Sequence, residues 1–231
     1  MNVLSLFSGI GGLELGLERA GMTVVGQVEI NPYATQVLER HWPNVPRHDD
    51  VRTTIDWWRS EPRPPLHVVA GGFPCQDVSD AGPRIGITGA RSALWNPMCD
   101  IVNALRPNYV IVENTPGLLA RGMGRVLGDL ADIGYDAEWQ VLSAGSFGAP
   151  HLRKRVFIVA YPQGVRERQL RWSGSTPEST TYWGVRGQES EPPVARVADG
   201  VPHRVDRLTA LGNAVVPQVA EHIGRMITEA N

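Results

Sequence analysis

The sequence has only two cysteines, one lysine and no long apolar run. Cys75 and Cys99 could form at most one bridge, which excludes a disulfide-rich secreted domain and leaves both thiols available for chemistry. The longest apolar stretches, such as 109–112 and 156–161, are far too short to cross a bilayer, and no charged and apolar leader follows Met1. We therefore expect a cytoplasmic protein without a membrane segment or a signal peptide.

The sequence also lacks a strong excess of charge of either sign. Its 231 residues have a formal net charge of −2, which excludes a chain that coats nucleic acid through bulk electrostatics. Local clustering is still present, because six basic residues and one acidic residue lie between positions 153 and 171. These side chains could face phosphate groups, or they could be solvated charges at the start of a strand.

Strand-like and helix-like segments alternate along the chain. Apolar runs predict strands at 2–7, 23–30, a segment that ends at Asp50, 67–72, 109–113, 137–142 and 155–161. Helices are predicted up to residue 21, at 32–41 with Asn31 as its cap, at 92–105 and 124–133, and around Val219, Ile223, Met226 and Ile227. This order predicts an α/β fold with a mostly parallel sheet of about seven strands flanked by helices. Residues 162–206 predict a small irregular insert.

A glycine-rich turn at 8–12 follows the first predicted strand. Parallel sheets bind nucleotide-like ligands beyond the carboxyl ends of their strands, although ordinary turns also use glycine. Glu14 stands where a dinucleotide fingerprint needs a small residue, and its carboxylate would oppose a pyrophosphate. A nucleoside without phosphate therefore fits better. Glu29 could accept hydrogen bonds from its ribose and Asp50 could lie near its adenine, but isolated acids are more often solvated.

Cys75 follows a predicted strand and lies on a loop, in the segment Gly72-Phe73-Pro74-Cys75-Gln76. Glu113 ends another strand of the same direction, so the thiol and the carboxyl should emerge at one edge of the sheet. Burial after an apolar strand should raise the pKa of Glu113, which suits an acid that donates a proton to a base. Cys99 lies inside a predicted helix and is interpreted as a small buried residue.

Five segments carry a family resemblance. They are Phe7-Ser8-Gly9-Ile10-Gly11-Gly12, Pro74-Cys75-Gln76, Glu113-Asn114-Thr115, Pro150-His151-Leu152-Arg153-Lys154-Arg155 and Gly212-Asn213-Ala214-Val215-Val216-Pro217. In this order they resemble the motif set of the Dcm-like DNA cytosine-C5 methyltransferases, which are known from restriction-modification systems. The resemblance implies a Rossmann-like methyltransferase fold that binds S-adenosylmethionine and acts on double-stranded DNA in a bacterial or phage-infected cell.

The resemblance also implies roles for individual residues. The Cys75 thiolate would attack C6 of a flipped cytosine and so activate C5 for methylation. Glu113 would bind N3 and the exocyclic amine. Arg153 and Arg155 would contact the base or nearby phosphates, with Arg153 as the expected catalytic partner, and Asn114 would hold the loop. No metal is implied.

The expected cofactor contacts come from both ends of the chain. They are Phe7, Gly9, Ile10, Gly12, Glu29, Ile30, Asp50, Val51, Pro74, Leu94, Asn213 and Val215. Because Asn213 arrives from the far end, the last helix should pack beside the first strand. The predicted division is a catalytic domain at 1–161, a target-recognition insert at 162–206 and a segment at 207–231 that completes the catalytic domain.

The short insert departs from the family pattern. Family members usually carry a recognition region of on the order of a hundred residues at this place, about the size of a small domain. The insert could form a short recognition site, require a partner protein or lower the activity, since flipping a base needs compensating contacts. Candidate DNA contacts are Arg166, Arg168, Arg171, Trp172, Tyr182 and Trp183. An RNA cytosine methyltransferase and a non-catalytic DNA-binding relative stay open, and a monomer is expected.

Overall fold

A computed structural model describes residues 1–74, 94–165 and 204–230. The strands are β1 (Asn2–Leu6), β2 (Thr23–Val28), β3 (Arg47–His48), β4 (Val68–Gly71), β5 (Tyr109–Asn114), β6 (Tyr135–Ser143) and β7 (Lys154–Pro162). The helices are α1 (Gly12–Arg19), α2 (Pro32–His41), α3 (Thr54–Arg59), α4 (Trp95–Leu105), α5 (Leu118–Arg121), α6 (Met123–Asp132), α7 (Arg204–Asn213) and α8 (Pro217–Glu229), with the short 3-10 turns η1 (Val51–Thr53) and η3 (Ala144–Phe147).

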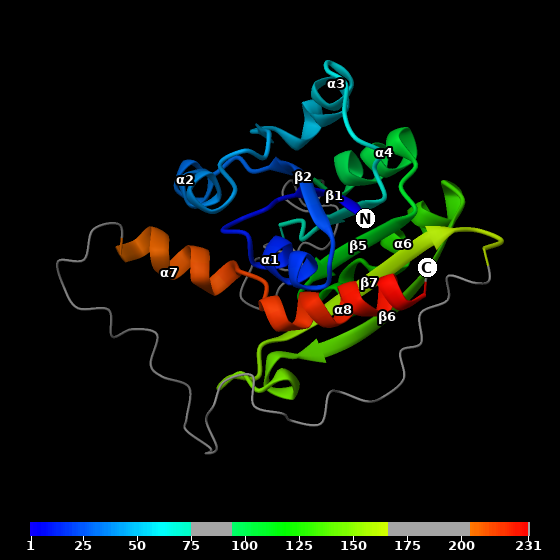
Figure 1. Cartoon of the computed structure of the whole chain (residues 1–231). Helices are drawn as coiled ribbons and strands as arrows, with labels where there is room; N and C mark the ends of the chain where they lie inside the picture. Colours follow the sequence, from blue (N-terminus) through cyan, green and yellow to red (C-terminus); the bar gives the residue numbers. More distant parts are fainter. Residues whose placement is uncertain (75–93, 166–203, 231) are drawn as a thin grey trace.

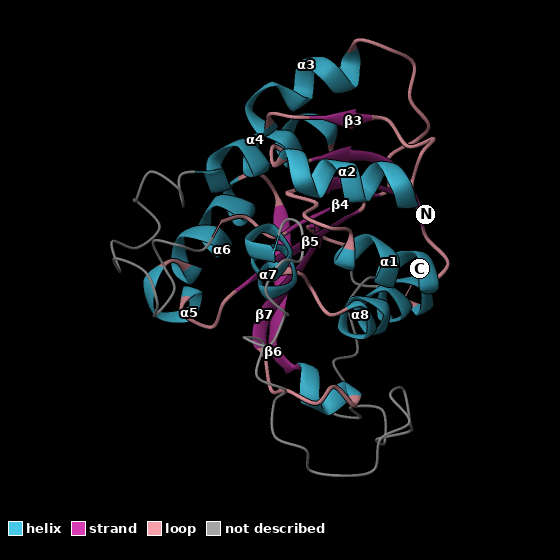
Figure 2. Ribbon diagram, turned by 90° about the vertical axis from the view of Figure 1, so that its left-hand side faces the viewer, coloured by secondary structure: helices cyan, strands magenta, loops and turns pink. Residues whose placement is uncertain are grey.

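The seven strands form one sheet in the order β3-β2-β1-β4-β5-β7-β6. Strands β3, β2, β1, β4 and β5 pair in parallel, whereas β7 runs antiparallel to both of its neighbours. The predicted sheet of about seven mostly parallel strands is therefore confirmed. Figure 2 shows α1 and α8 on one face of the sheet and α4, α5 and α6 on the other.

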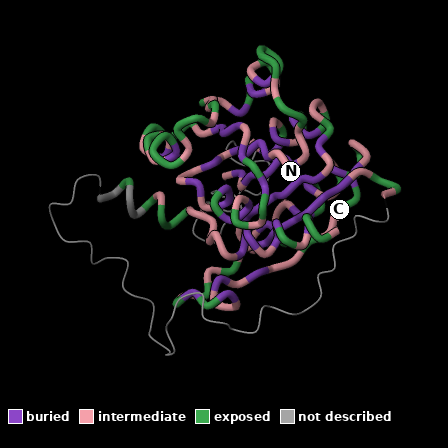
Figure 3. Tube along the Cα trace, viewed as in Figure 1, coloured by how far each residue is buried: buried purple, intermediate pink, exposed green. Residues whose placement is uncertain are grey.

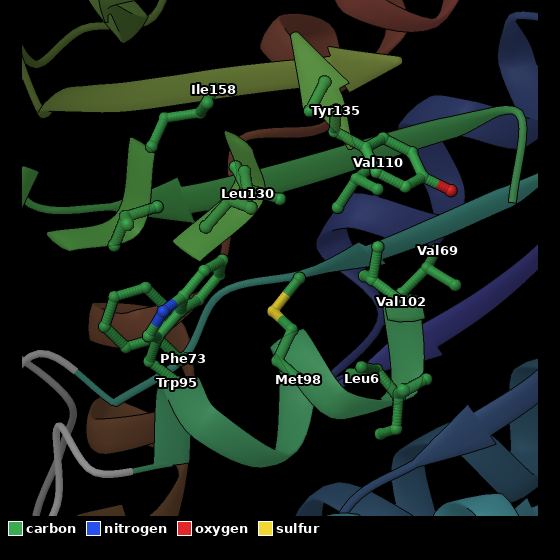
Figure 4. Packing of buried hydrophobic residues seen from close by; sticks show 14 of the residues in the cluster. Leu6, Val69, Phe73, Trp95, Met98, Val102, Val110, Leu130, Tyr135 and Ile158 are labelled. Atoms are coloured by element: carbon green, nitrogen blue, oxygen red, sulfur yellow. The ribbon is translucent and has the colours of Figure 1, made fainter. Parts of the chain in front are cut away.

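Both faces of the central strands are buried, which gives the molecule two apolar cores. Side chains alternate along a strand. Leu4 and Leu6 therefore enter the core beneath α4 and α6, while Val3 enters the core beneath α1 and α8. Figure 3 shows the buried chain running through the middle of the molecule, and Figure 4 shows the first of these cores around Met98 and Val102. The strands are thus fixed from both sides, and so are the loops at their ends.

Helix α2 begins as its sequence predicts. The Asn31 side chain accepts hydrogen bonds from the backbone N–H groups of Tyr33 and Ala34, at 2.9 and 3.0 Å, and Pro32 occupies the first turn. Asparagine is a strong N-cap, and proline costs no hydrogen bond at the first helical position. The chain therefore turns away from the sheet directly after β2.

The last helix packs on the first helix, as expected from the sequence. Gly16 of α1 lies against the backbone of Pro217 and the Ala220 side chain, so that a Cβ at Gly16 would overlap both. Val219 and Ile223 of α8 enter the same core as Val3 of β1. Residues from the two ends of the chain thus form one layer on this face of the sheet.

Three features differ from the sequence-based expectations. The third strand is only Arg47–His48, and Asp50 caps the turn η1 instead of ending the strand. Helices α3 and α5 were not expected. Helix α7 was not expected either, because the sequence predicted irregular chain up to residue 206 and the next helix only near Val219. Within the described ranges, no helix is long and apolar enough to cross a membrane.

Candidate active site

A cavity of about 330 Å³ lies at the carboxyl ends of the parallel strands. Its walls come from the segments that follow β1, β2, β4 and β5, and from α7. Figure 1 shows α7 extending from the start of α8 along the side of the molecule on which α2 lies. Ligands of open α/β sheets bind at this edge, so the cavity is the candidate active site.

The cavity brings together most of the predicted site residues. The expected cofactor residues that line it are Phe7, Gly9, Ile10, Gly12, Glu29, Pro74, Asn213 and Val215, and the expected catalytic residues that line it are Glu113 and Arg155. Four expected cofactor residues and Arg153 are not among the lining residues. The cavity therefore joins the expected cofactor end and the expected chemical end of the site.

The loop between β1 and α1 bends sharply at the cavity. Phe7, Gly9 and Gly11 all have positive φ angles of 54°, 55° and 87°. Glycine adopts this region freely, whereas phenylalanine does so only under local strain, which is common at functional sites. The backbone N–H of Gly9 donates to a Glu29 carboxylate oxygen at 2.7 Å. The loop is thus tied to the end of β2.

Glu29 accepts a second backbone hydrogen bond. Its other carboxylate oxygen accepts from the N–H of Asn31 at 2.7 Å. The sequence left open whether Glu29 is a solvated acid, and its two backbone contacts show that it is an anchored one. A carboxylate held in this way presents its remaining lone pairs to the cavity in a fixed orientation.

Gly12 has a packing role that its sequence context did not reveal. A Cβ at Gly12 would overlap the carbonyl oxygen of Val215. The backbone at the start of α1 therefore touches the segment between α7 and α8, and both residues line the cavity. Only glycine permits this approach.

Glu113, which is buried, and Arg155, which is partly exposed, form an ion pair on the cavity wall. The distance between Arg155 Nε and Glu113 Oε1 is 3.0 Å. Burial raises the pKa of Glu113, as predicted, and the opposing effects of the Arg155 and Arg153 charges are smaller. Glu113 is thereby placed between a desolvating pocket that favours its neutral form and an arginine that orients its carboxyl group.

Arg153 contacts the last turn of α7, and its charge also acts on Glu113. Its guanidinium donates a hydrogen bond to the carbonyl oxygen of Gly212, the residue before Asn213. It is Arg155 that contacts Glu113 directly. The backbone at Arg153 has a φ of 22°, so Arg153 and Arg155 are not equivalent positions of one regular strand. Arg153 connects the entrance of β7 to the end of α7.

The segment that leads to Cys75 is held from two sides. The Asn114 amide donates to the carbonyl oxygen of Phe73 at 3.1 Å, which agrees with the expectation that Asn114 holds this loop. The Phe73 ring packs against Trp95 with a centroid distance of 5.6 Å (Figure 4). Pro74 is the last described residue before Cys75, which lies outside the described residues, as do the candidate DNA contacts at positions 166–183.

The remaining expected cofactor residues lie around the cavity without lining it. Ile30 is exposed over 71% of its surface, and Leu94 is partly buried at the start of α4. Asp50 accepts a hydrogen bond from the backbone N–H of Arg52 at 2.9 Å. Val51 is buried in the core. The backbone after β3 is therefore fixed by capping, while its expected contacts with an adenine stay predictions.

Several lining residues were not expected from the sequence. From α7 they are Asp206, Thr209 and Ala210; from the β1 side they are Ser5, Ser8 and Leu13; and from α2 they are Tyr33 and Ala34. The residues of α7 that line the cavity are spaced by three or four positions, at 206, 209, 210 and 213. This spacing places them on one face of the helix. The sequence around α7 has too few apolar residues at helical spacing to predict this helix.

Glu14 lies in the interior, whereas Cys99 is partly buried and lies away from the cavity lining. Glu14 in the first turn of α1 is fully buried and does not line the cavity. Cys99 is half-buried and packs against the core beneath α4, as interpreted from the sequence. Burial, followed by the charge of Asp129, raises the pKa of Cys99 to about 11, so this thiol is a poor nucleophile near neutral pH.

The charged lining of the cavity suits a cationic ligand better than a phosphate. Among the described lining residues the carboxylates are Glu29, Glu113 and Asp206, and the one cation, Arg155, is already paired with Glu113. A pyrophosphate would add its negative charge to that of these carboxylates. A nucleoside that carries a sulfonium fits this set of residues, with Glu29 available to its hydroxyl groups.

Comparison with known proteins agrees with this geometry. The family model described as C-5 cytosine-specific DNA methylase matches residues 1–190. The chain is 33% identical over 220 residues to the type II methyltransferase M2.BsuMI of Bacillus subtilis, which covers 87% of this chain and 55% of that protein. It is 36% identical over 165 residues to the type II methyltransferase M.Eco47II of Escherichia coli, covering 68% of this chain and 39% of that protein. The chain spans about half the length of the curated relatives it matches.

Solved structures share the fold. An Escherichia coli prophage protein described as a DNA modification methyltransferase aligns with a TM-score of 0.59 and 27% identity, covering 70% of this chain and 47% of that one. The Entamoeba histolytica methyltransferase EhMeth aligns with a TM-score of 0.59 and 22% identity, covering 70% of this chain and 52% of that one. The second likeness shows the fold alone.

Proposed function

Because this chain belongs to the family of C-5 cytosine-specific DNA methylases, we propose that it transfers a methyl group from S-adenosylmethionine to C5 of a cytosine in double-stranded DNA. The observation that carries the proposal is the ion pair of the buried Glu113 with Arg155. This pair lies on the wall of the cavity that Pro74 also lines, one residue before Cys75.

Cys75 is the proposed nucleophile. Its thiolate adds to C6 of the cytosine, and the ring electron pair moves toward C5, which becomes nucleophilic. When bound, S-adenosylmethionine supplies an electrophilic methyl group. Loss of the C5 proton then restores the double bond and expels Cys75. The contact between Asn114 and the Phe73 carbonyl supports this role, because it fixes the chain two residues before the thiol.

Glu113 is the proposed proton donor to N3 of the base. Thiolate addition places negative charge on the ring, and a neutral carboxyl group at N3 can neutralise that charge. Burial raises the pKa of Glu113, which supports this role because it favours the neutral form of the carboxyl group that can donate a proton. Arg155 is the proposed partner that orients this group, whereas Arg153 acts from the Gly212 side, within reach of nearby phosphates.

The proposed cofactor contacts divide into two groups. Eight of them line the cavity: Phe7, Gly9, Ile10, Gly12, Glu29, Pro74, Asn213 and Val215. The other four, Ile30, Asp50, Val51 and Leu94, are proposed as cofactor contacts from the family resemblance alone. Glu29 is assigned to the ribose because two backbone donors already orient it. Asp50 is assigned to the adenine end.

Target recognition is proposed to fall to the insert. The proposed division is catalytic residues 1–161, a recognition insert at 162–206 and a C-terminal segment at 207–231 that completes the catalytic unit. The packing of α8 on α1 supports the last assignment. With about 45 insert residues, either a short DNA site or a partner protein would supply the remaining contacts. We further propose a cytoplasmic monomer.

Trapping of the covalent adduct tests the proposed chemistry. A long duplex with 5-fluorocytosine in place of cytosine should form a stable complex with the protein and S-adenosylmethionine, because fluorine cannot leave as a cation. Cys75→Ser should form none. Cys99→Ser is the matched control and should trap as the wild type does, since Cys99 does not line the cavity and burial raises its pKa. Equal trapping by wild type and Cys75→Ser would overturn the assignment.

A further inference from the structure

Glu14 is a buried carboxylate for which the proposed chemistry has no use. It lies in the first turn of α1 with none of its surface exposed. Both carboxylate oxygens are buried without a well-formed hydrogen bond to any described residue. Its nearest polar neighbours are the hydroxyls of Ser5 and Ser8, and both serines line the cavity. Glu14 therefore lies directly behind the cavity wall.

The charges around Glu14 give it no cationic partner among the described residues. Glu29 is the charged group close enough to affect it, and Glu29 is also an acid. On α8, which packs against α1, Glu221 is already paired with Arg225 at 2.7 Å. On β2 the buried polar residue is the uncharged Gln27. Burial, the largest cause, raises the pKa of Glu14 to about 7.

The Ser5 and Ser8 hydroxyls lower the pKa of Glu14 by less than burial raises it. A buried carboxylate without a cationic partner is then stabilised further either by binding a proton or by a cation that lies nearby. Resting on the proposed function, the cavity beyond Ser5 and Ser8 takes a methyl donor whose sulfonium is positive. After transfer the product is a neutral thioether. The charge in the cavity therefore changes by one unit on the other side of Ser5 and Ser8, which line the cavity and neighbour Glu14.

We propose that Glu14 is a specificity-determining residue that distinguishes the sulfonium donor from its neutral product by charge. Ionised Glu14 favours the donor through the low dielectric of the wall. After methyl transfer this attraction disappears, which assists release of S-adenosylhomocysteine. Binding of the donor to protonated Glu14 releases the proton of the carboxyl group to solvent, so charge is conserved.

The sign of the pH dependence follows from the raised pKa. Near pH 6 about a tenth of Glu14 is ionised, and near pH 8 about nine-tenths is ionised. Affinity for S-adenosylmethionine should therefore rise by up to about tenfold over this interval relative to affinity for S-adenosylhomocysteine. Glu113 also lines the cavity with a raised pKa, and His222 of α8 has a lowered one, so both can titrate nearby.

Calorimetric titration of both ligands against wild type and Glu14→Gln separates these contributions. Ligand amino groups and the other side chains titrate equally in both proteins, so the difference between the proteins isolates Glu14. In the wild type the ratio of the two affinities should rise about tenfold from pH 6 to pH 8. In Glu14→Gln the same ratio should lack this tenfold rise. At pH 7, donor binding should release about half a proton more from the wild type.

Two further variants keep the test decisive. Glu14→Met is neutral and suits a buried position, so it should match Glu14→Gln even if the amide variant folds poorly. Glu39→Gln removes an exposed carboxylate on α2 and should match the wild type. An identical pH dependence in wild type and Glu14→Gln would overturn the proposal while leaving the proposed function intact. Failure of the wild type to bind either ligand would overturn both.

Discussion

The two long walls of the cavity are built in different ways. Helix α1 is fixed by backbone contact, because Gly12 meets the Val215 carbonyl and Gly16 meets α8. Helix α7 faces the cavity with exposed residues, including Asp206 and Asn213. The difference shows that the first wall belongs to the apolar core, while the second depends on polar contacts such as that of Arg153 with the Gly212 carbonyl.

The largest expected effect is on methyl transfer, and it should distinguish Arg155, which pairs with Glu113, from Arg153, which contacts the end of α7. Arg155→Ala leaves Glu113 buried without its closest cation, so methyl transfer should fall by about 10² or more while cofactor affinity changes little. Arg153→Ala loses the contact to Gly212, so cofactor affinity should weaken by about three- to tenfold. Single-turnover rates and calorimetric Kd values measure the two effects.

Arg153 was the expected catalytic partner from the sequence, so this pair of variants also tests that expectation. If Arg153→Ala abolishes transfer at saturating cofactor while Arg155→Ala remains active, the assignment from the ion pair is wrong. Lys154→Ala is a neighbouring control, since Lys154 is exposed and lies between the two arginines.

A smaller effect is expected on the α1 side and concerns stability. Gly16→Ala places a methyl group against the Pro217 carbonyl and Ala220, and should lower the free energy of unfolding by about 1–3 kcal/mol. Gly128→Ala is the matched control, because Gly128 is exposed in α6 with open space around its Cα. It should raise the free energy of unfolding by about 0.5–1 kcal/mol. Denaturant unfolding measures both, and equal changes would contradict the packing argument.

Local signals predicted much of the fold because the physics behind them is local. Asn31 followed by Pro32 predicted the start of α2, since capping depends on neighbouring residues alone. The apolar runs and the helix-like segments between them predicted a sheet flanked by helices, and both faces of the central strands are indeed buried. Helix α7 was not predicted because few apolar residues of this helix pack on the rest of the molecule, so its sequence lacks the apolar spacing that indicates a helix. Leu211, for example, is an exposed leucine on this helix.

The sequence predicted the site residues that directly follow strands. It predicted less well the residues whose burial or orientation depends on tertiary contacts. Glu113 was expected at a strand end with a raised pKa, and both features are present. Glu14 was interpreted only as a charge unsuited to a pyrophosphate, because a first-turn acid is usually solvated. Its complete burial depends on β1 and the β1–α1 loop folding against α1. Whether Arg153 or Arg155 faces Glu113 likewise depends on the backbone at Arg153, which the sequence does not reveal.

Transfer of a labelled methyl group tests the central claim most directly. The purified chain should transfer the methyl group of labelled S-adenosylmethionine to duplex DNA, with the label recovered as 5-methylcytosine, and Cys75→Ser should transfer none. Label that appears in tRNA and not in DNA would contradict the account, as would the absence of transfer from a wild-type protein that binds both the cofactor and DNA.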